Sequence, residues 1–226
     1  MLKVHNLSYQ IKGKPLLTTL TATSKPGSFI GLIGENGAGK TTLLRALSGL
    51  LMPSQGRTTL NDTCLQTLSA PQRPSMLSYF SMEDVDIWQL HVQEILSLFA
   101  PNPSSRLYQE LDIEKIKNHP FHTLSSGQKQ RVVLALCLSP SVPLYLLDEP
   151  LNSLDHRHQH QVMRLLKKMS DQGRIVIASC HQLDLVKQYC TDIWLLQDGR
   201  LAQSGPTETA LTSDTLETFF GISKDV

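Results

Sequence analysis

Residues 29–50 read FIGLIGENGAGKTTLLRALSGL, and this stretch decides the fold. The apolar segment Phe29–Ile33 has the length of a buried strand, and a glycine-rich loop follows it. From Lys40 to Leu50 the pattern is helical, and Pro53 stops it soon afterwards. A strand, a loop and a helix in this order form the repeating unit of an α/β protein, so we expect a parallel sheet at the centre of the molecule.

The loop between this strand and this helix matches the pattern GxxxxGK[ST] at every fixed position. Its glycines let successive backbone N–H groups turn inward around a polyphosphate, and the helix presents its positive end to the same anion. Lys40 adds a charge near the β- and γ-phosphates, and the Thr41 hydroxyl suits Mg²⁺, which prefers hard oxygen ligands. We predict that nucleotide is bound by Gly34, Glu35, Asn36, Gly37, Ala38, Gly39, Lys40, Thr41 and Thr42, with Thr41 also a ligand of Mg²⁺.

A second part of the candidate site follows the apolar segment Leu144–Leu147. Two carboxylates, Asp148 and Glu149, stand at its end, where a buried strand would hold them rigidly. Taken alone, such a pair is also common in plain turns. Phosphoryl transfer, however, depends on charge stabilisation and an oriented nucleophile. Beside the phosphate loop we therefore expect Asp148 to hold Mg²⁺ and Glu149 to orient and deprotonate the attacking water as the catalytic base.

The composition describes a folded chain without a strong overall charge. Of 226 residues, 40% are hydrophobic and 18% are charged, and the formal net charge is +1. This balance excludes a disordered chain and supplies no broad positive field for nucleic acid. The apolar runs are shorter than the roughly 18 residues that span a bilayer, and the first residues lack the pattern of a signal peptide. We expect the protein to stay in the cytosol and to bind no nucleic acid.

The rest of the pattern predicts a single domain over residues 1–226. Short β segments at Leu2–Tyr9 and Leu16–Thr23 suggest antiparallel pairing at the N-terminus. Further αβ units are expected towards the C-terminus, with strands at Leu144–Leu147, Ile175–Ser179 and Ile193–Leu196 and helices at Asp155–Lys168 and Leu183–Tyr189.

Between about residues 83 and 140 we expect an inserted helical subdomain, because the strand pattern disappears there. One helix is predicted at Trp88–Phe99 and a second near Leu107–Lys117, with a break at Pro101 and Pro103.

The cysteines and histidines form no clear metal motif. The four cysteines are too far apart for a CxxC pair, so we interpret them as reduced, with Cys137 in the core. Three histidines alternate at positions 156, 158 and 160, but residues two apart on a helix point in nearly opposite directions. Only His156 and His160 would share a face, and we favour a solvated helix start over a metal site.

A third motif is Leu124-Ser125-Ser126-Gly127-Gln128. Read alone, Ser125 is a plain helix N-cap. Together with the phosphate loop and the two carboxylates, the motif makes the chain resemble the ATP-binding subunits of ABC transporters, whose signature has the form LSGGQ. Ser126 departs from that form, since it replaces a glycine. In this family the motif opens a helix that faces the γ-phosphate held by a second subunit, so the resemblance implies ATP binding across a dimer by Ser125, Ser126, Gly127 and Gln128.

The resemblance covers nearly the whole chain and implies further site residues. Asn152–Asp155 matches the segment called the D-loop at the subunit interface. His181 matches the switch histidine that contacts the γ-phosphate and takes part in catalysis, and Tyr9 matches the aromatic residue that stacks on adenine. The implied fold is an α/β P-loop NTPase core with a mixed sheet, an N-terminal antiparallel β subdomain and an inserted α-helical subdomain.

The family also implies an activity and partners. The activity is ATP hydrolysis with ATP and Mg²⁺ as cofactors. The partners are a second copy of the chain, two transmembrane permease subunits and, indirectly, a periplasmic substrate-binding protein. The implied location is the cytoplasmic face of the bacterial inner membrane, as a peripheral subunit.

One position departs from the family in a way that bears on catalysis. A glutamine that reaches Mg²⁺ and the attacking water normally follows the strand before the helical insert, and here that strand is residues 77–81. The glutamine position aligns with Met82, whose thioether is a soft and weak acceptor. Either Glu83 takes the role, or the site tolerates the loss and turns ATP over more slowly. We expect hydrolysis to persist, because the other residues of the site are all present, namely Lys40, Thr41, Asp148, Glu149 and His181.

The cargo is the least determined feature. Residues 147–155, 179–183 and 193–205 are most similar to ATPase subunits of vitamin B12 (cobalamin) importers. The alternatives are an iron-siderophore or haem importer, or a soluble ABC ATPase of DNA repair or translation, which would carry two cassettes or a long coiled-coil insertion. A P-loop kinase is disfavoured because the signature motif and His181 would then have no function.

Overall fold

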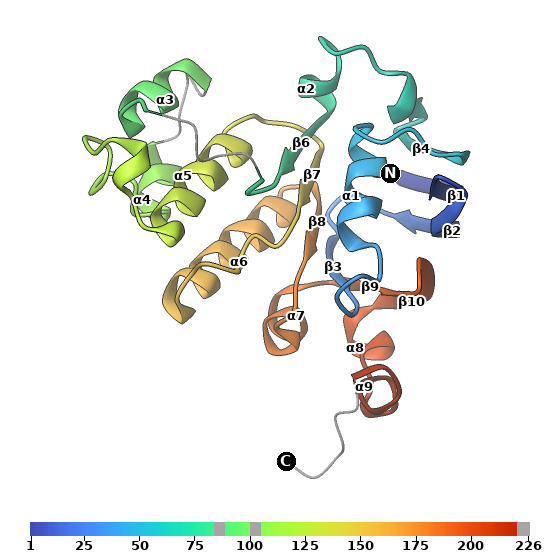
Figure 1. The fold of residues 1–226 in the computed structure, drawn as a ribbon. Coiled ribbons are helices and arrows are strands. Elements are labelled where there is room, and N and C mark those ends of the chain that lie inside the picture. Colours follow the sequence, from blue (N-terminus) through green and yellow to red (C-terminus); the bar gives the residue numbers. More distant parts are fainter. Residues whose placement is uncertain (84–88, 100–104, 221–226) are drawn as a thin grey trace.

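The computed structural model describes residues 1–83, 89–99 and 105–220, and its centre is a six-stranded sheet (Figure 1). The strand order is β10-β9-β3-β8-β7-β6. The first five strands in chain order run parallel, and β10 is antiparallel to β9 at one edge. The strands are β3 Phe29–Ile33, β6 Leu77–Phe80, β7 Leu144–Leu147, β8 Ile175–Ser179, β9 Asp192–Gln197 and β10 Arg200–Pro206.

A second, antiparallel sheet has the order β2-β1-β4-β5. Its strands are β1 Leu2–Ile11, β2 Lys14–Ser24, β4 Gln55–Leu60 and β5 Thr63–Cys64. The predicted pairing of the first two segments is confirmed. Strands β4, β5 and β10 were not predicted. They are half exposed and carry few apolar side chains, so pairing with neighbouring strands rather than burial holds them.

Helices cover both faces of the central sheet. Side chains alternate along each central strand, so Tyr145 and Leu147 join one hydrophobic cluster while Leu144 and Leu146 join another. The first cluster packs the sheet against α5, α6 and α7, and the second packs it against α1 and the antiparallel sheet. The α-helices are α1 Lys40–Ser48, α2 Arg73–Met76, α3 Val92–Phe99, α4 Ser105–Glu110, α5 Ser126–Leu138, α6 His156–Asp171, α7 Leu183–Tyr189, α8 Thr207–Ala210 and α9 Ser213–Phe220, with two short 3₁₀ turns at Leu65–Thr67 and Phe121–Thr123.

Helices α3, α4 and α5 gather on one side of the molecule (Figure 1). They fall in the range where we expected the insert, although the helix predicted near residues 107–117 was too long. The chain leaves α4 at Glu110 because Asp112 has a φ of 52° and Ile113 N–H donates to the Tyr108 carbonyl at 2.8 Å. Just beyond the end of α4, the guanidinium of Arg131 donates a hydrogen bond to the Leu111 carbonyl oxygen at 2.9 Å. Trp88, Pro101 and Pro103 lie outside the described residues.

The predictions for Cys137 and for the alternating histidines agree with the structure. Cys137 is buried, and burial raises the pKa of its thiol to about 12. His156 and His160 do share a face of α6, with their Nε2 atoms 3.3 Å apart, while His158 turns away to Asp112 and Asp155. Among the described helices, none combines the length and hydropathy needed to cross a bilayer.

Close backbone packing at Gly56 supports a stability prediction. Gly56 has a φ of 80°, and a Cβ added there would lie 2.3 Å from the His5 carbonyl oxygen. Gly13 has nearly the same φ, 81°, but has nothing within 4 Å of that position. Both alanine variants should suffer the left-handed backbone strain of about 1–2 kcal/mol. Gly56→Ala should lose about 1–3 kcal/mol more through overpacking, which urea denaturation of the pair would measure. Equal losses would contradict this account.

Candidate functional site

The phosphate loop joins β3 to α1 at the carboxyl end of the strand, as predicted. Gly39 is the residue before α1, with a φ of 103°, and because glycine has no side chain to cap the helix, the first N–H groups of α1 stay available to an anion. The loop is held from outside by Gly199, whose N–H donates to the Ala38 carbonyl at 3.1 Å. The backbone arrangement is therefore suited to a phosphate chain.

Lys40 is buried within this loop, with 5% of its surface exposed. Its Nζ donates to the carbonyl oxygens of Gly34 at 2.8 Å and Glu35 at 3.0 Å. Burial lowers the pKa of Lys40, and the negative charges of Glu149 and Asp148 act in the opposite direction. The ammonium is thus held in place by backbone carbonyls, with no carboxylate of the described residues bonded to it directly, and an incoming phosphate would relieve the cost of its burial.

Asp148 stands at the end of β7, where Phe80 of the neighbouring strand accepts its N–H at 2.9 Å. Burial raises the pKa of the Asp148 carboxyl, against hydrogen bonds from Thr41 and Ser179 and the charge of Arg45. The Ser179 hydroxyl donates to Asp148 Oδ1 at 3.0 Å. A half-buried carboxylate next to a threonine hydroxyl is a hard oxygen donor set, and this chemistry fits Mg²⁺.

Glu149 is the next residue and has an unusual backbone, with a φ of 49°. Its N–H donates to Ser179 Oγ at 2.7 Å, which ties the turn to the end of β8. Its carboxylate accepts a hydrogen bond from Asn152 Nδ2 and lies 3.1 Å from His181 Nε2. The structure therefore brings together Glu149 and His181, which are far apart in the sequence and both predicted to act in catalysis.

A cavity of about 360 Å³ opens beside these groups. It is lined by Thr41, Ser81, Met82, Glu83, Gln130, Asp148, Glu149, Asn152 and Ser153. Met82 thus lines this cavity from the position at which the family resemblance leads one to expect a glutamine. The Glu83 carboxylate forms an ion pair with Arg45 of α1, so it is engaged with the helix that follows the phosphate loop.

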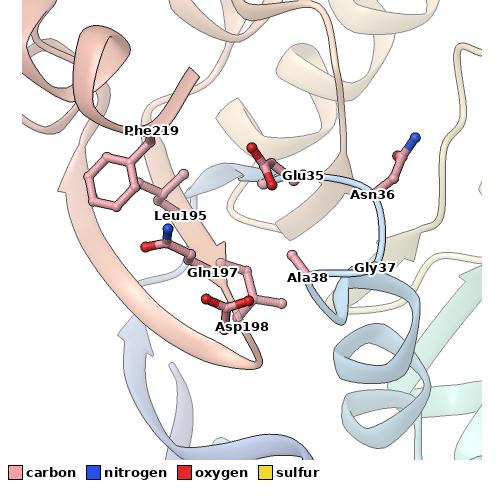
Figure 2. Close-up of a pocket in the computed structure, with 10 residues that line it drawn as sticks. Glu35, Asn36, Gly37, Ala38, Leu195, Gln197, Asp198 and Phe219 are labelled. Atoms are coloured by element: carbon pink, nitrogen blue, oxygen red, sulfur yellow. The ribbon is translucent and has the colours of Figure 1, made fainter. Parts of the chain in front are cut away.

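A second, smaller cavity of about 170 Å³ borders the other flank of the phosphate loop. Figure 2 shows Glu35, Asn36 and Ala38 on one side and Leu195, Gln197 and Asp198 from the end of β9 on the other, with the Phe219 ring of α9 beside them. No motif in the sequence marks Phe219, because its helix near the C-terminus carries none.

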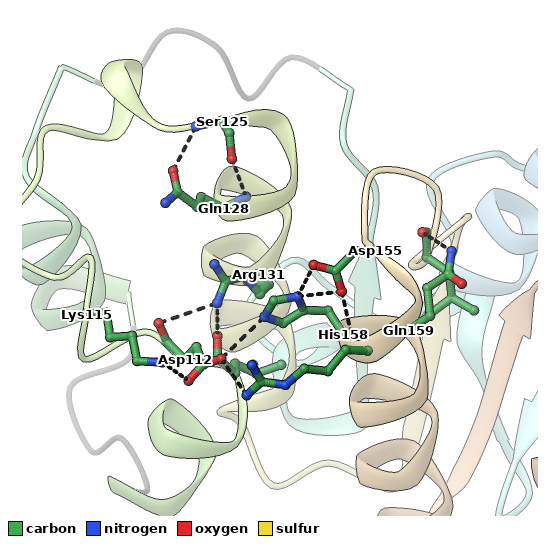
Figure 3. Close-up of polar contacts among 11 residues, drawn as sticks. Asp112, Lys115, Ser125, Gln128, Arg131, Asp155, His158 and Gln159 are labelled. Atoms are coloured by element: carbon green, nitrogen blue, oxygen red, sulfur yellow. Dashed lines mark hydrogen bonds and ion pairs between the residues drawn. The ribbon is translucent and has the colours of Figure 1, made fainter.

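The signature residues form the start of α5. Ser125 caps this helix by accepting the Gln128 N–H at 3.3 Å, and the Gln128 side chain accepts the Ser125 N–H at 2.9 Å (Figure 3). Ser126 and Gly127 occupy its first turn, so the plain N-cap interpretation is correct as local structure. Among the described residues that line the two cavities, none comes from 125–128.

Of the other predicted binding residues, Tyr9, Gly39, Lys40 and Thr42 also lie outside the lining of these cavities. Tyr9 is half buried in β1, where it is paired with Leu17 of β2, and the Leu17 side chain lies 3.0 Å from the position that a Cβ at Gly39 would take. Thr42 is in the first turn of α1. Neither residue lines the cavity of Asp148 and Glu149.

Polar contacts join the start of α6 to the segment after α4 (Figure 3). Asp155 caps α6 by accepting the His158 N–H at 2.9 Å, and the His158 ring lies between Asp155 and Asp112. The His158 N–H, followed by the ring, holds the pKa of Asp155 below its usual value. Burial raises the pKa of Asp112, but hydrogen bonds from Lys115 and His158 and nearby positive charges outweigh it, so the pKa is lowered overall. Asp155 is the last residue of the predicted D-loop, so that loop is anchored at its end.

Three residues of the site were missed. Ser179 holds both carboxylate residues, Arg45 pairs with Glu83, and Gln130 lines the larger cavity. Ser179 ends a strand parallel to β7, and the shared edge of the sheet is a signal that could have found it. Arg45 and Gln130 lie inside helices and had no signal beyond their residue types.

Comparisons with known proteins agree with this arrangement. The family model described as ABC transporter matches residues 17–152. The hemin import ATP-binding protein HmuV of Bordetella pertussis is 34% identical, over 100% of this chain and 94% of its own. The cobalamin import ATP-binding protein BtuD of Halobacterium salinarum is 29% identical, over 97% of this chain and 58% of its own. A solved structure described as the ATP binding subunit of an ABC transporter superposes with a TM-score of 0.83 at 26% identity, over 99% and 95% of the two chains.

Proposed function

Since this chain belongs to the ABC transporter family of ATP-binding proteins, we propose that it is the ATP-hydrolysing subunit of an import complex. The carrying observation is the convergence of a buried lysine in a phosphate loop with Asp148, Glu149 and His181 at neighbouring strand ends. The two relatives named above are both described as import ATP-binding proteins, which supports the direction of transport.

The proposed roles combine the contacts of the residues with the motifs that the chain shares with its family. The loop residues 34–42 bind the phosphates, with Lys40 supplying the charge, and Tyr9 stacks on the adenine ring. Thr41 and Asp148 hold Mg²⁺, which would neutralise phosphate charge when bound. Glu149 takes a proton from the attacking water, and His181 at 3.1 Å keeps the carboxylate oriented and reaches the γ-phosphate.

We propose that the active form contains two copies of the chain. Ser125 and Ser126 are exposed at the N-terminal end of α5, where the helix dipole favours an anion, and they are available to a nucleotide held by a partner. Gly127 and Gln128, which follow them in the first turn of α5, complete the surface that would face the partner's nucleotide. ATP would close the pair and hydrolysis would reopen it, and the movement would be passed to two permease subunits at the cytoplasmic face of the membrane.

For the cargo we propose a metal-bearing macrocycle of the tetrapyrrole type. Hemin and cobalamin, named for the relatives, are both of this class, and both resemblances extend along nearly the whole chain. Cobalamin was favoured by the sequence segments, whereas the relatives at 34% identity are described as hemin importers. Uptake of labelled cobalamin and of hemin, compared in cells with and without this chain, separates the two cargoes.

A direct test of the proposed function uses the purified chain. With Mg²⁺ and ATP it should release phosphate and change from a monomer to a dimer by light scattering as nucleotide is added. Release of phosphate by a permanent monomer would contradict the proposed dimer. A failure to retain nucleotide in the presence of Mg²⁺ would contradict the function itself.

The methionine at position 82 gives a separate prediction. Met82→Gln places an amide oxygen in the cavity of Thr41 and Asp148, where a hydrogen bond of about 1 kcal/mol to the attacking water or the metal shell should raise the hydrolysis rate about fivefold. Phosphate release at varied Mg²⁺ concentration measures this. Met52→Gln is the matched control, because Met52 is 64% exposed outside the cavity. An unchanged rate would show that the departure at Met82 is harmless.

A further inference from the structure

Helix α5 begins in the motif 124–128 and is called the signature helix below, and residues 149–153 are called the catalytic turn. The buried side chain of Gln130 lies between the two. Gln130 is in the second turn of α5 and has 1% of its surface exposed. A buried primary amide is costly unless both of its ends are bonded, and both are. Its Oε1 accepts the Ser153 N–H at 3.0 Å, and its Nε2 donates to the Glu149 carbonyl at 3.4 Å. One side chain therefore holds the first and the last residue of the turn 149–153.

The first turn of α5 touches the same turn directly. A Cβ added to Gly127 would lie 2.6 Å from the Ser153 carbonyl oxygen, so helix backbone and turn backbone are in contact. Gly127 and Gln130 are three residues apart and share one face of α5. The signature helix thus rests on the catalytic turn at two successive points of that face.

The catalytic turn needs such support. Glu149 has a φ of 49°, a conformation that costs a non-glycine residue free energy and persists only where surrounding contacts impose it. The Glu149 carbonyl also accepts the Asn152 N–H at 3.4 Å, and the Asn152 side chain donates to the Glu149 carboxylate. A change in the shape of the turn would therefore move the carboxylate that we assign as the base.

The other side of α5 is anchored away from the turn. The neighbouring Arg131 is buried and donates to the Leu111 carbonyl at 2.9 Å, in the segment that follows α4 (Figure 3). Helix α5 is consequently bonded to the segment after α4 through Arg131 and to the catalytic turn through Gln130.

We propose that Gln130 is a positioning residue for ATP hydrolysis, which fixes the Glu149–Ser153 turn to the signature helix so that the base and the signature motif move together. The proposal rests on the proposed ATPase function. Gln130 lines the cavity beside Glu149, but it acts through the turn and not on the nucleotide.

Three variants test this role. Gln130→Met keeps the volume and removes both hydrogen bonds, and it should lower kcat about 10- to 30-fold while the affinity for ATP, set by the phosphate loop, changes less than twofold. Gln188→Met, at an exposed site on α7, is the control and should change neither value. In the presence of Glu149→Gln, Gln130→Met should have little further effect, because the turn then positions no base.

Gln130→Glu provides a pH readout that a purely structural role would not produce. A protonated carboxyl can donate to the Glu149 carbonyl and accept from Ser153, whereas a carboxylate can only accept. Activity of this variant relative to the wild type should therefore rise as the pH is lowered from 8.5 to 6.0.

The outcomes separate the two proposals. If the wild-type chain hydrolyses ATP and folded Gln130→Met does so at the same kcat, the positioning role is refuted and the ATPase function stands. An equal loss in kcat and ATP affinity, or a flat pH ratio for Gln130→Glu, also refutes it. If the wild-type chain itself releases no phosphate, the proposed function fails, and the positioning role fails with it.

Discussion

Glu149→Gln should bind ATP with unchanged affinity and hydrolyse it about 10²–10⁴-fold more slowly, the range that a general base contributes. The amide has the shape of the carboxylate, so an oxygen can still accept the hydrogen bond from Asn152. It cannot take a proton from water. The chain would then remain as a nucleotide-bound dimer, which light scattering with Mg²⁺ and ATP would detect.

The matched control for this change is Glu114→Gln, in the segment after α4. Glu114 pairs with Lys117 at 2.7 Å on the surface, and an exposed ion pair contributes about 0–1 kcal/mol to stability. The control should hydrolyse ATP at the wild-type rate. Normal turnover in Glu149→Gln would remove Glu149 from the role of base and direct attention to His181.

Lys40→Met should weaken ATP binding by about 10²–10⁴-fold. Each charged hydrogen bond to a phosphate is worth about 1.5–3 kcal/mol, and the lysine is expected to reach two phosphates. The folded chain should survive, because the cost of burying the ammonium, seen in the lowered pKa of Lys40, disappears together with its bonds to Gly34 and Glu35. Nucleotide affinity by calorimetry and the melting temperature separate the two effects.

Lys117→Met removes a lysine charge in the same way and is the control for Lys40→Met, since Lys117 pairs with Glu114 at the surface and is not part of the phosphate loop. It should retain full ATP affinity. If Lys40→Met bound ATP normally, the phosphate loop would not be the nucleotide site. If Lys40→Met failed to fold, the hydrogen bonds from the ammonium to the Gly34 and Glu35 carbonyl oxygens would stabilise the loop more than we infer.

The elements predicted most accurately are those with strong local signals. Strands β3, β7 and β8 have the predicted bounds because each is a short, continuous apolar run bounded by glycine or polar turns, and helix α7 has them because its apolar residues recur at helical spacing. The predicted helix near residues 107–117 failed where a single backbone conformation at Asp112 and a distant Arg131 ended it. Strand β10 was missed because it is held at the sheet edge by β9 and carries few buried side chains.

The residues of the candidate site were likewise predicted where the signal is local, while their contacts with distant residues were not. The phosphate loop and the carboxylate pair were predicted because each is a short motif whose chemistry resides in consecutive residues. The contacts of Ser179 and His181 with the carboxylates join residues about thirty positions apart, and they form because β7 and β8 are neighbours and end at the same edge of the sheet. The engagement of Glu83 by Arg45 also has no local signal.

What this sequence determined alone is therefore the kind of chemistry, since an oxygen ligand for Mg²⁺, a lysine for phosphate and a carboxylate base are properties of residue types at fixed local spacing. The tertiary structure decided which of these groups meet, and it placed Gln130 under the catalytic turn. Such contacts depend on how strands and helices pack, which is set by burial over the whole chain rather than by any short stretch of it.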